Sequence, residues 1–240
     1  MTTVQMRKLN SSFDSNNMKY GQIAGNKHIN DLIYHCFEYI CKEEEQKFVK
    51  KFREQPNNSD QVMHTFRELM LGGYLGSMGL RVKHELLVDT KTPDWCILDE
   101  KSEVACLVEL TNFQIDKATE MEIEAQLRNR GIALFWRDGN KDNVDRLYQS
   151  MWHKAEVYGV LVQKLKVPYV VALFGEFRAA IDSEEIRRCL FSQGFRLFEM
   201  HPEVSGVLYF EETFGRYSFH FFRSPNPLRV FDLPSGFFPP

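Results

Sequence analysis

Residues 167–177, VPYVVALFGEF, form the segment that most restricts the fold of this chain. Almost every side chain in it is apolar, which is typical of a central strand in a sheet that is covered on both faces. Helical patterns flank it over 143–166 and 183–192. We therefore expect an α/β protein with a mixed central β-sheet flanked by helices.

The N-terminal third of the chain predicts helices. Residues 1–27 are polar and rich in Asn and Ser, so a flexible tail is expected there. In residues 28–55 apolar side chains recur at helical spacing, which predicts a helix that extends the domain on its N-terminal side. A polar break over 55–60 separates it from a second helix over 61–78.

Glycines stand out in this second helix. Gly72, Gly73 and Gly76 each lower helix propensity by up to about 1 kcal/mol. A helix that keeps them is expected to let a sheet or another backbone approach closely. Gly79 is the expected end of the helix.

A three-strand meander is expected next. The pattern predicts strands over 81–88, 94–98 and 104–113, with a polar turn, DEKSE, between the last two. Both of these last strands are rich in apolar residues, as a half-buried hairpin should be.

The second half of the chain predicts alternating elements. An amphipathic helix is expected over 116–130, followed by the long helix, the apolar strand and the shorter helix already described. A closing hairpin is expected near 205–225, and the Pro-rich residues 226–240 are expected to lie extended on the surface. No internal repeat or change of composition marks a second core, so residues 28–240 are taken as a single domain.

Composition narrows the functional classes. The chain has 240 residues and a formal net charge of −3, which does not indicate a strongly basic nucleic-acid binder but leaves a local basic groove open. Its five Cys residues form no CxxC pair and no zinc-finger spacing, which fits a reducing cytoplasm. No apolar run is long enough for a signal peptide or a membrane span, so a cytoplasmic protein without membrane contact is expected.

Two acids occupy corresponding positions on the predicted hairpin. Asp94 follows Pro93 at the start of one strand, Glu109 lies near the end of the next, and 14 residues separate them. Because the turn lies near 99–103, both acids are expected at the same open end. Two carboxylates there can share a hard divalent cation, which prefers oxygen ligands and can activate water beside a phosphate. A carboxylate cluster of this kind is expected to raise the pKa values of its members when no metal is bound.

The segments TPDWCI and LVELT resemble the PD-(D/E)XK, or restriction-endonuclease-like, nuclease superfamily. The resemblance covers approximately residues 61–177 and implies a Mg²⁺ or Mn²⁺ site held by Asp94, Glu109 and the backbone carbonyl of Leu110. It also implies that Glu68, on the preceding helix, joins the catalytic site.

The resemblance breaks at Thr111, where the superfamily carries a lysine. That lysine positions the attacking water and stabilises developing negative charge. Lys154 borders the apolar side of the long helix and is the leading candidate for a relocated lysine, while Lys117 is a weaker one. For Lys154 an ordinary role as a lysine at a helix margin remains equally open.

Three functional hypotheses remain at this point. The first is a metal-dependent nuclease that hydrolyses the phosphodiester bonds of DNA, or less readily of RNA. The second is a catalytically inactive nuclease-like fold that serves as a binding or assembly module; aromatic side chains of the closing hairpin would then face outward to dock a partner (Phe214, Tyr217, Phe219, Phe221 and Phe222). For these aromatics, a sheet buried on both faces is the alternative.

The third hypothesis, an enzyme with a nucleophilic cysteine, has little support, because Cys96 and Cys106 lie in apolar strands and are expected to be inert core residues. A homodimer is left open, because many nucleases of this kind cut two strands with two subunits.

Overall fold

The computed structural model describes residues 27–54, 59–113, 117–130, 141–175, 181, 183–192, 196–213 and 216–238. It divides the chain into two compact units. The first unit extends to Leu110 and includes Phe237 and Phe238, and the second unit runs from Thr111 to Gly236. The prediction of a flexible tail at 1–27 falls almost entirely outside the described residues, and the single-domain boundaries stay a prediction.

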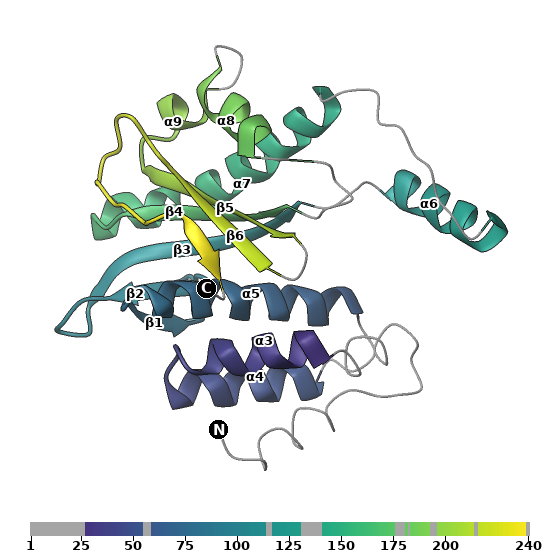
Figure 1. Cartoon of the computed structure of the whole chain (residues 1–240). Helices are drawn as coiled ribbons and strands as arrows, with labels where there is room; N and C mark the ends of the chain where they lie inside the picture. Colours follow the sequence, from purple (N-terminus) through teal and green to yellow (C-terminus); the bar gives the residue numbers. More distant parts are fainter. Residues whose placement is uncertain are drawn as a thin grey trace. The chain divides into compact units, whose positions relative to one another are not determined.

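The first unit consists of helices followed by an antiparallel meander (Figure 1). Its elements are α3 (Lys27–Phe37), α4 (Lys42–Glu54), α5 (Ser59–Ser77), β1 (Arg81–His84), β2 (Trp95–Leu98) and the first part of β3 (Val104–Phe113). Strand β1 pairs with β2, and β2 pairs with β3, both antiparallel. Helix α5 contacts α3, α4 and β1, so it is the element around which this unit packs.

The second unit contains a mixed sheet with helices packed against it. Its elements are α6 (Lys117–Arg130), α7 (Lys141–Leu165), β4 (Tyr169–Gly175), α8 (Ser183–Phe191), α9 (Leu197–Met200), β5 (Val204–Thr213) and β6 (Arg216–Arg223). Strand β4 runs parallel to β5, β5 runs antiparallel to β6, and α7 contacts β4, α8 and α9. Each described side chain of β4 is buried, as its apolar sequence predicts.

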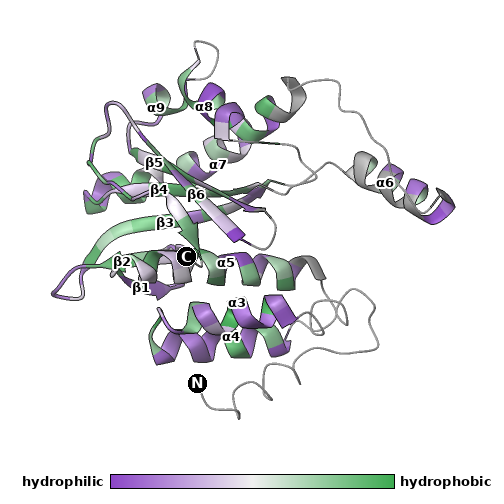
Figure 2. Ribbon diagram, viewed as in Figure 1, coloured by the Kyte–Doolittle hydropathy of each residue, from purple (hydrophilic) through white to green (hydrophobic). Residues whose placement is uncertain are grey.

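These observations confirm the α/β class with mixed strand pairing and flanking helices. Figure 2 shows the strands β3, β4 and β5 in hydrophobic colours, whereas α4 is largely hydrophilic. The finer assignment, a restriction-endonuclease-like fold, is taken up below as part of a proposal.

The close approach predicted for the glycines of α5 is confirmed. A Cβ atom on Gly72 would lie 2.0 Å from the Trp95 ring, and one on Gly76 would lie 2.1 Å from the backbone oxygen of Tyr39. Gly79 has a φ of +78°, and its N–H donates to the carbonyl of Gly76 just after α5 ends. Only glycine adopts that backbone conformation readily, which is why the helix stops there.

The prediction of one helix over 28–55 is wrong, because the segment forms α3 and α4 with a break at 38–41. After α3 the backbone tightens, and Glu38 and Tyr39 donate to carbonyls three residues back. Helix α4 then carries three glutamates in its first turn, which favour a new helix N-terminus. Periodicity alone missed the break, because both helices bury an apolar face.

The first strand of the meander is shorter than predicted. It ends at His84 rather than at Val88, since the next residue, Glu85, adopts a φ of 48°. Residues in this left-handed region leave the extended conformation.

Predictions for the C-terminal part also need correction. Tyr217, Phe219 and Phe222 of β6 are buried, so the aromatics do not alternate outward, while Phe214 lies outside the described residues. The expectation of a surface tail is wrong for Phe238, which is 1% exposed and belongs to the short strand β7 (Gly236–Phe238). The ring of Phe238 packs beside Tyr39 at a centroid distance of 5.8 Å.

Candidate functional site

The start of β2 brings Asp94 and Glu109 together. Trp95 pairs with Val108 in the antiparallel register, which places Asp94 beside Glu109 on the neighbouring strand. The backbone N–H of Asp94 donates to Glu109 Oε1 at 3.0 Å. In return, the backbone N–H of Leu110 donates to Asp94 Oδ2 at 2.7 Å. Each carboxylate therefore accepts a hydrogen bond from the opposite strand, and we call these two residues the acid pair.

The acid pair lies at the border between the interior of the first unit and solvent. Glu109 is 2% exposed, whereas Asp94 is partly exposed. Burial raises the pKa of the nearby Cys96 thiol to about 12, and the negative charge of Glu109 adds to this shift. Cys96 and Cys106 are both buried, and burial also raises the pKa of Cys106, as expected for inert core thiols.

The donors at the acid pair are oxygen atoms, the ligand type that Mg²⁺ prefers. Within the residues that the structure describes, no three or more His, Cys, Asp or Glu side chains gather as a metal-binding group. Mg²⁺ is commonly held by only one or two carboxylates and keeps several waters. A carboxylate offers about four lone-pair directions, so a backbone hydrogen bond on one oxygen is compatible with a cation. Asp94, Glu109 and the Leu110 carbonyl can supply such a set.

Glu68 is held by other partners. Its Oε1 lies 3.0 Å from His64 Nε2, and its Oε2 lies 3.0 Å from His84 Nε2 and 3.1 Å from Lys51 Nζ. Burial alone would raise the pKa of Glu68, but hydrogen bonds from the two histidines and the charge of Lys51 outweigh it and hold the pKa well below its usual range. The expectation of raised pKa values in a carboxylate cluster is therefore wrong for Glu68.

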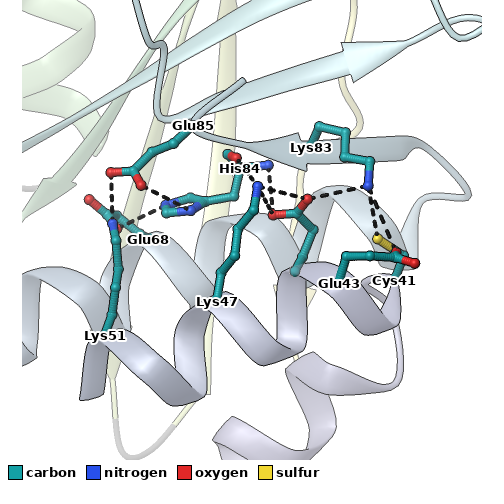
Figure 3. Close-up of polar contacts among 9 residues, drawn as sticks. Cys41, Glu43, Lys47, Lys51, Glu68, Lys83, His84 and Glu85 are labelled. Atoms are coloured by element: carbon teal, nitrogen blue, oxygen red, sulfur yellow. Dashed lines mark hydrogen bonds and ion pairs between the residues drawn. The ribbon is translucent and has the colours of Figure 1, made fainter. Parts of the chain in front are cut away.

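Glu68 belongs to a larger charged cluster that connects α4, α5 and β1 (Figure 3). The members of this charged cluster are Cys41, Glu43, Glu44, Lys47, Lys51, Glu68, Lys83, His84 and Glu85. Lys51 reaches from α4 to Glu68 and also to Glu85, with a 2.8 Å contact to Glu85 Oε1. Four carboxylates thus face three ammonium groups, and the histidine lies among them.

Side chains of α4 complete the backbone hydrogen bonds of β1. The N–H of His84 donates to Glu44 Oε2 at 3.2 Å, and the carbonyl of His84 accepts from Lys47 Nζ at 2.9 Å. Glu44 is fully buried, and Lys47 Nζ also lies 3.1 Å from its carboxylate. These contacts cover the outer edge of β1, whose only partner among the described strands is β2.

The charged cluster is connected to the acid pair through the backbone. Glu85 N–H donates to the carbonyl oxygen of Asp94 at 3.1 Å. Trp95, the next residue, donates its Nε1–H to the backbone oxygen of Glu68 at 2.9 Å. The carbonyl of Asp94 and the indole of Trp95 are therefore both held by residues of the charged cluster, Glu85 and Glu68.

The candidate lysines lie in the second unit. Lys154 is a partly buried residue of α7, whose backbone carbonyl accepts from the Tyr169 hydroxyl at 3.2 Å. Lys117 is the first residue of α6, and Thr111 is a partly exposed residue of β3. The proposed roles of the two lysines stay predictions.

Sequence reasoning missed the charged cluster. The signal for it is the series Glu44, Lys47 and Lys51, which recurs at the helical spacing of three and four residues. What the sequence does not show is that this face of α4 lies against the end of β1.

Comparison with protein-family models, curated proteins and solved structures finds no match to this chain. Among the described helices, none combines the length and apolar character needed to cross a membrane. The chain is therefore described by its own features: it is an α/β protein that carries a pair of carboxylates at the open end of the hairpin formed by β2 and β3.

Proposed function

We propose that this chain is a divalent-metal-dependent nuclease that hydrolyses phosphodiester bonds of DNA or RNA, with a restriction-endonuclease-like core at about residues 61–177. The observation that supports this proposal most directly is the acid pair. Its two carboxylates come from adjacent strands and are fixed by reciprocal backbone hydrogen bonds of 3.0 and 2.7 Å. Such fixed carboxylates are suited to bind a cation without a large ordering cost.

In this proposal Asp94, Glu109 and the Leu110 carbonyl hold Mg²⁺ or Mn²⁺, which when bound supplies an activated water and neutralises charge on the phosphate. Asp94 is the partly exposed member, so a phosphate would reach the pair from the side of Asp94. Glu109 is enclosed by apolar strand residues, where its charge acts through a lower dielectric. Lys154 is the proposed source of positive charge in place of the lysine that Thr111 lacks.

For Glu68 the contacts support a positioning role. Its carboxylate is ionised and held by three partners, and its backbone oxygen accepts from Trp95 Nε1. Glu68 thereby fixes the ring of the residue that follows Asp94. We propose that it acts on Asp94 through Trp95 rather than by direct contact with the substrate.

A second candidate function is a non-catalytic binding or assembly module on the same fold. Two observations favour it: Thr111 replaces the lysine, and the carboxylate of Glu68 is committed to His64, His84 and Lys51. Nucleic acid, with DNA ahead of RNA, is the partner proposed in both cases, and a homodimer stays a proposal.

Two assays distinguish the two functions: a metal-binding titration and then a cleavage assay. Mn²⁺ is titrated by calorimetry into the wild type and into an Asp94→Asn, Glu109→Gln double variant. A Glu100→Gln, Glu103→Gln variant is the matched control, since it removes two exposed charges at the other end of the hairpin. The titration is repeated in the presence of a short DNA duplex, because a phosphate can complete the coordination.

A nuclease requires saturable Mn²⁺ binding in the wild type and the control but not in the acid-pair variant. It also requires metal-dependent cleavage of labelled DNA or RNA that Lys154→Ala weakens. Metal binding without cleavage supports the binding module. If neither the free protein nor the protein with DNA binds Mn²⁺, the acid pair is not a metal site and the nuclease proposal fails.

A further inference from the structure

The buried imidazole of His84 has an unequal environment at its two nitrogens. The side chain is 0% exposed and packs against the rings of Phe48 and Trp95, with centroid distances of 4.4 and 5.0 Å. Nε2 lies 3.0 Å from Glu68 Oε2. Nδ1 is buried and has no hydrogen-bond partner.

The contact with Glu68 determines the neutral tautomer of His84. The ionised Glu68 carboxylate only accepts hydrogen bonds, so Nε2 carries the proton. Nδ1 of the neutral ring then carries a lone pair. The nearest charged group on that side is Glu85 Oε2 at 3.8 Å, which is also an acceptor. Two acceptors facing each other cannot form a hydrogen bond, and the distance of 3.8 Å agrees with this.

Protonation would change this contact from two acceptors to a donor and an acceptor. A charge-assisted N–H···O bond has a length of about 2.8 Å, so the two atoms need to approach by roughly 1 Å. Glu85 is able to make this movement because its side chain is 44% exposed and it follows the end of β1. Its other oxygen is bound by Lys51.

Charged groups surround His84. The groups that face it are Glu44, Lys47 and Lys51 from α4, His64 and Glu68 from α5, Lys83 from β1, and Glu85 from the turn that follows β1. From β2 it meets the uncharged Trp95 ring. With Glu43 included, the charged cluster holds four carboxylates against three ammonium groups. With neutral histidines, the formal charges of the cluster therefore leave one negative charge in excess.

We infer that His84 is a proton-operated latch in the first unit: uptake of one proton draws Glu85 onto Nδ1 and tightens the connection between β1 and the helices α4 and α5. Because Glu85 N–H donates to the carbonyl of Asp94, the latch also acts on the strand that carries the acid pair. The inference concerns the folded unit itself and does not depend on metal binding or on nuclease activity.

The latch is tested by ¹⁵N NMR of the imidazole nitrogens between about pH 8 and pH 5.5, where histidines exchange protons. The His84 signals are assigned by comparison with His84→Gln. We expect the Nε2–H tautomer at the high end, and protons on both nitrogens at the low end. Glu85→Gln removes the anionic acceptor and should lower the midpoint of the His84 titration by about one pH unit. Glu54→Gln, an exposed α4 residue, is the matched control and should leave it unchanged.

Two results would overturn the inference. In one, His84 stays neutral down to the pH at which the protein unfolds. In the other, Glu85→Gln and Glu54→Gln give the same His84 titration as the wild type. The side chains of Glu85 and Glu54 are exposed, so neither substitution should disturb the fold. Amide NMR spectra of both variants at about pH 8 check that the fold is intact.

Discussion

Replacing Gly76 by alanine is the most direct test of how α5 packs in the first unit. The new Cβ would lie 2.1 Å from the carbonyl oxygen of Tyr39 and 2.9 Å from its carbonyl carbon. Non-bonded carbon contacts are normally about 3.5 Å or longer, so α5 and the turn after α3 must separate by roughly 1 Å. The obstacle is backbone, which cannot rotate away as a side chain can.

Two opposing effects set the expected magnitude. Alanine in place of a mid-helix glycine stabilises a helix by about 1 kcal/mol. Forced overpacking costs about 1–3 kcal/mol, and a backbone contact this short belongs at or above the upper end. Gly76→Ala should therefore lower the free energy of unfolding by about 2 kcal/mol.

The assay is urea denaturation followed by circular dichroism, with Met78→Ala as the control. Met78 is 37% exposed, so its truncation should change the free energy of unfolding by less than about 0.5 kcal/mol. If Gly76→Ala is as stable as the wild type or more stable, helix propensity outweighs the clash and the described packing of α5 on the turn is wrong.

Three further predictions concern the same unit and the thiols. The pKa of Glu68 is held below the ordinary 4.5, so this residue contributes stability that is fully present above about pH 4.5 and is lost as the pH falls further. Glu68→Gln should lower the free energy of unfolding at pH 7 by about 3 kcal/mol. In urea titrations at several pH values, the variant should also lose less stability in acid than the wild type does. Of the five cysteines, Cys41 alone is exposed, so a thiol reagent should label one group per native chain and five after unfolding; rapid native labelling of more than one would contradict the described burial. Asp94→Asn in a chelating buffer should lower the free energy of unfolding by about 1 kcal/mol, because Leu110 N–H loses a charged acceptor, whereas Glu100→Gln should have no measurable effect.

Most of the fold follows from periodicity and from the positions of Gly and Pro. The strand at 169–175 and the helix that precedes it are specified by their own apolar patterns. The break between α3 and α4 is not, because residues 38–41 contain neither Gly nor Pro and the apolar spacing continues across it. The positive φ at Glu85 is equally hidden, since the following Leu86 and Leu87 continue a strand-like pattern.

The site was predictable only in part. A hairpin register relates residues at a fixed distance along the chain, so the turn at 99–103 brings Asp94 close to Glu109. Their exact pairing also needs the register shift between Ile97 and Leu98, because the pair Leu98–Val104 beside the turn would otherwise place Asp94 opposite Val108. No sequence pattern predicts that shift. The partners of Glu68 do not follow in this way. Lys51 and His84 come from elements whose packing depends on the shape of the whole unit, and no local pattern encodes that contact.

The burial of Phe238 has a consequence for how the first unit folds during translation. Its ring lies near His35, Tyr39 and Tyr74, at centroid distances of 5.0, 5.8 and 6.5 Å. On a translating ribosome these three residues emerge early, while Phe238 follows only after every residue of the second unit has been synthesised. The aromatic surface of the first unit therefore stays uncovered by Phe238 until residues 111–236 have been synthesised.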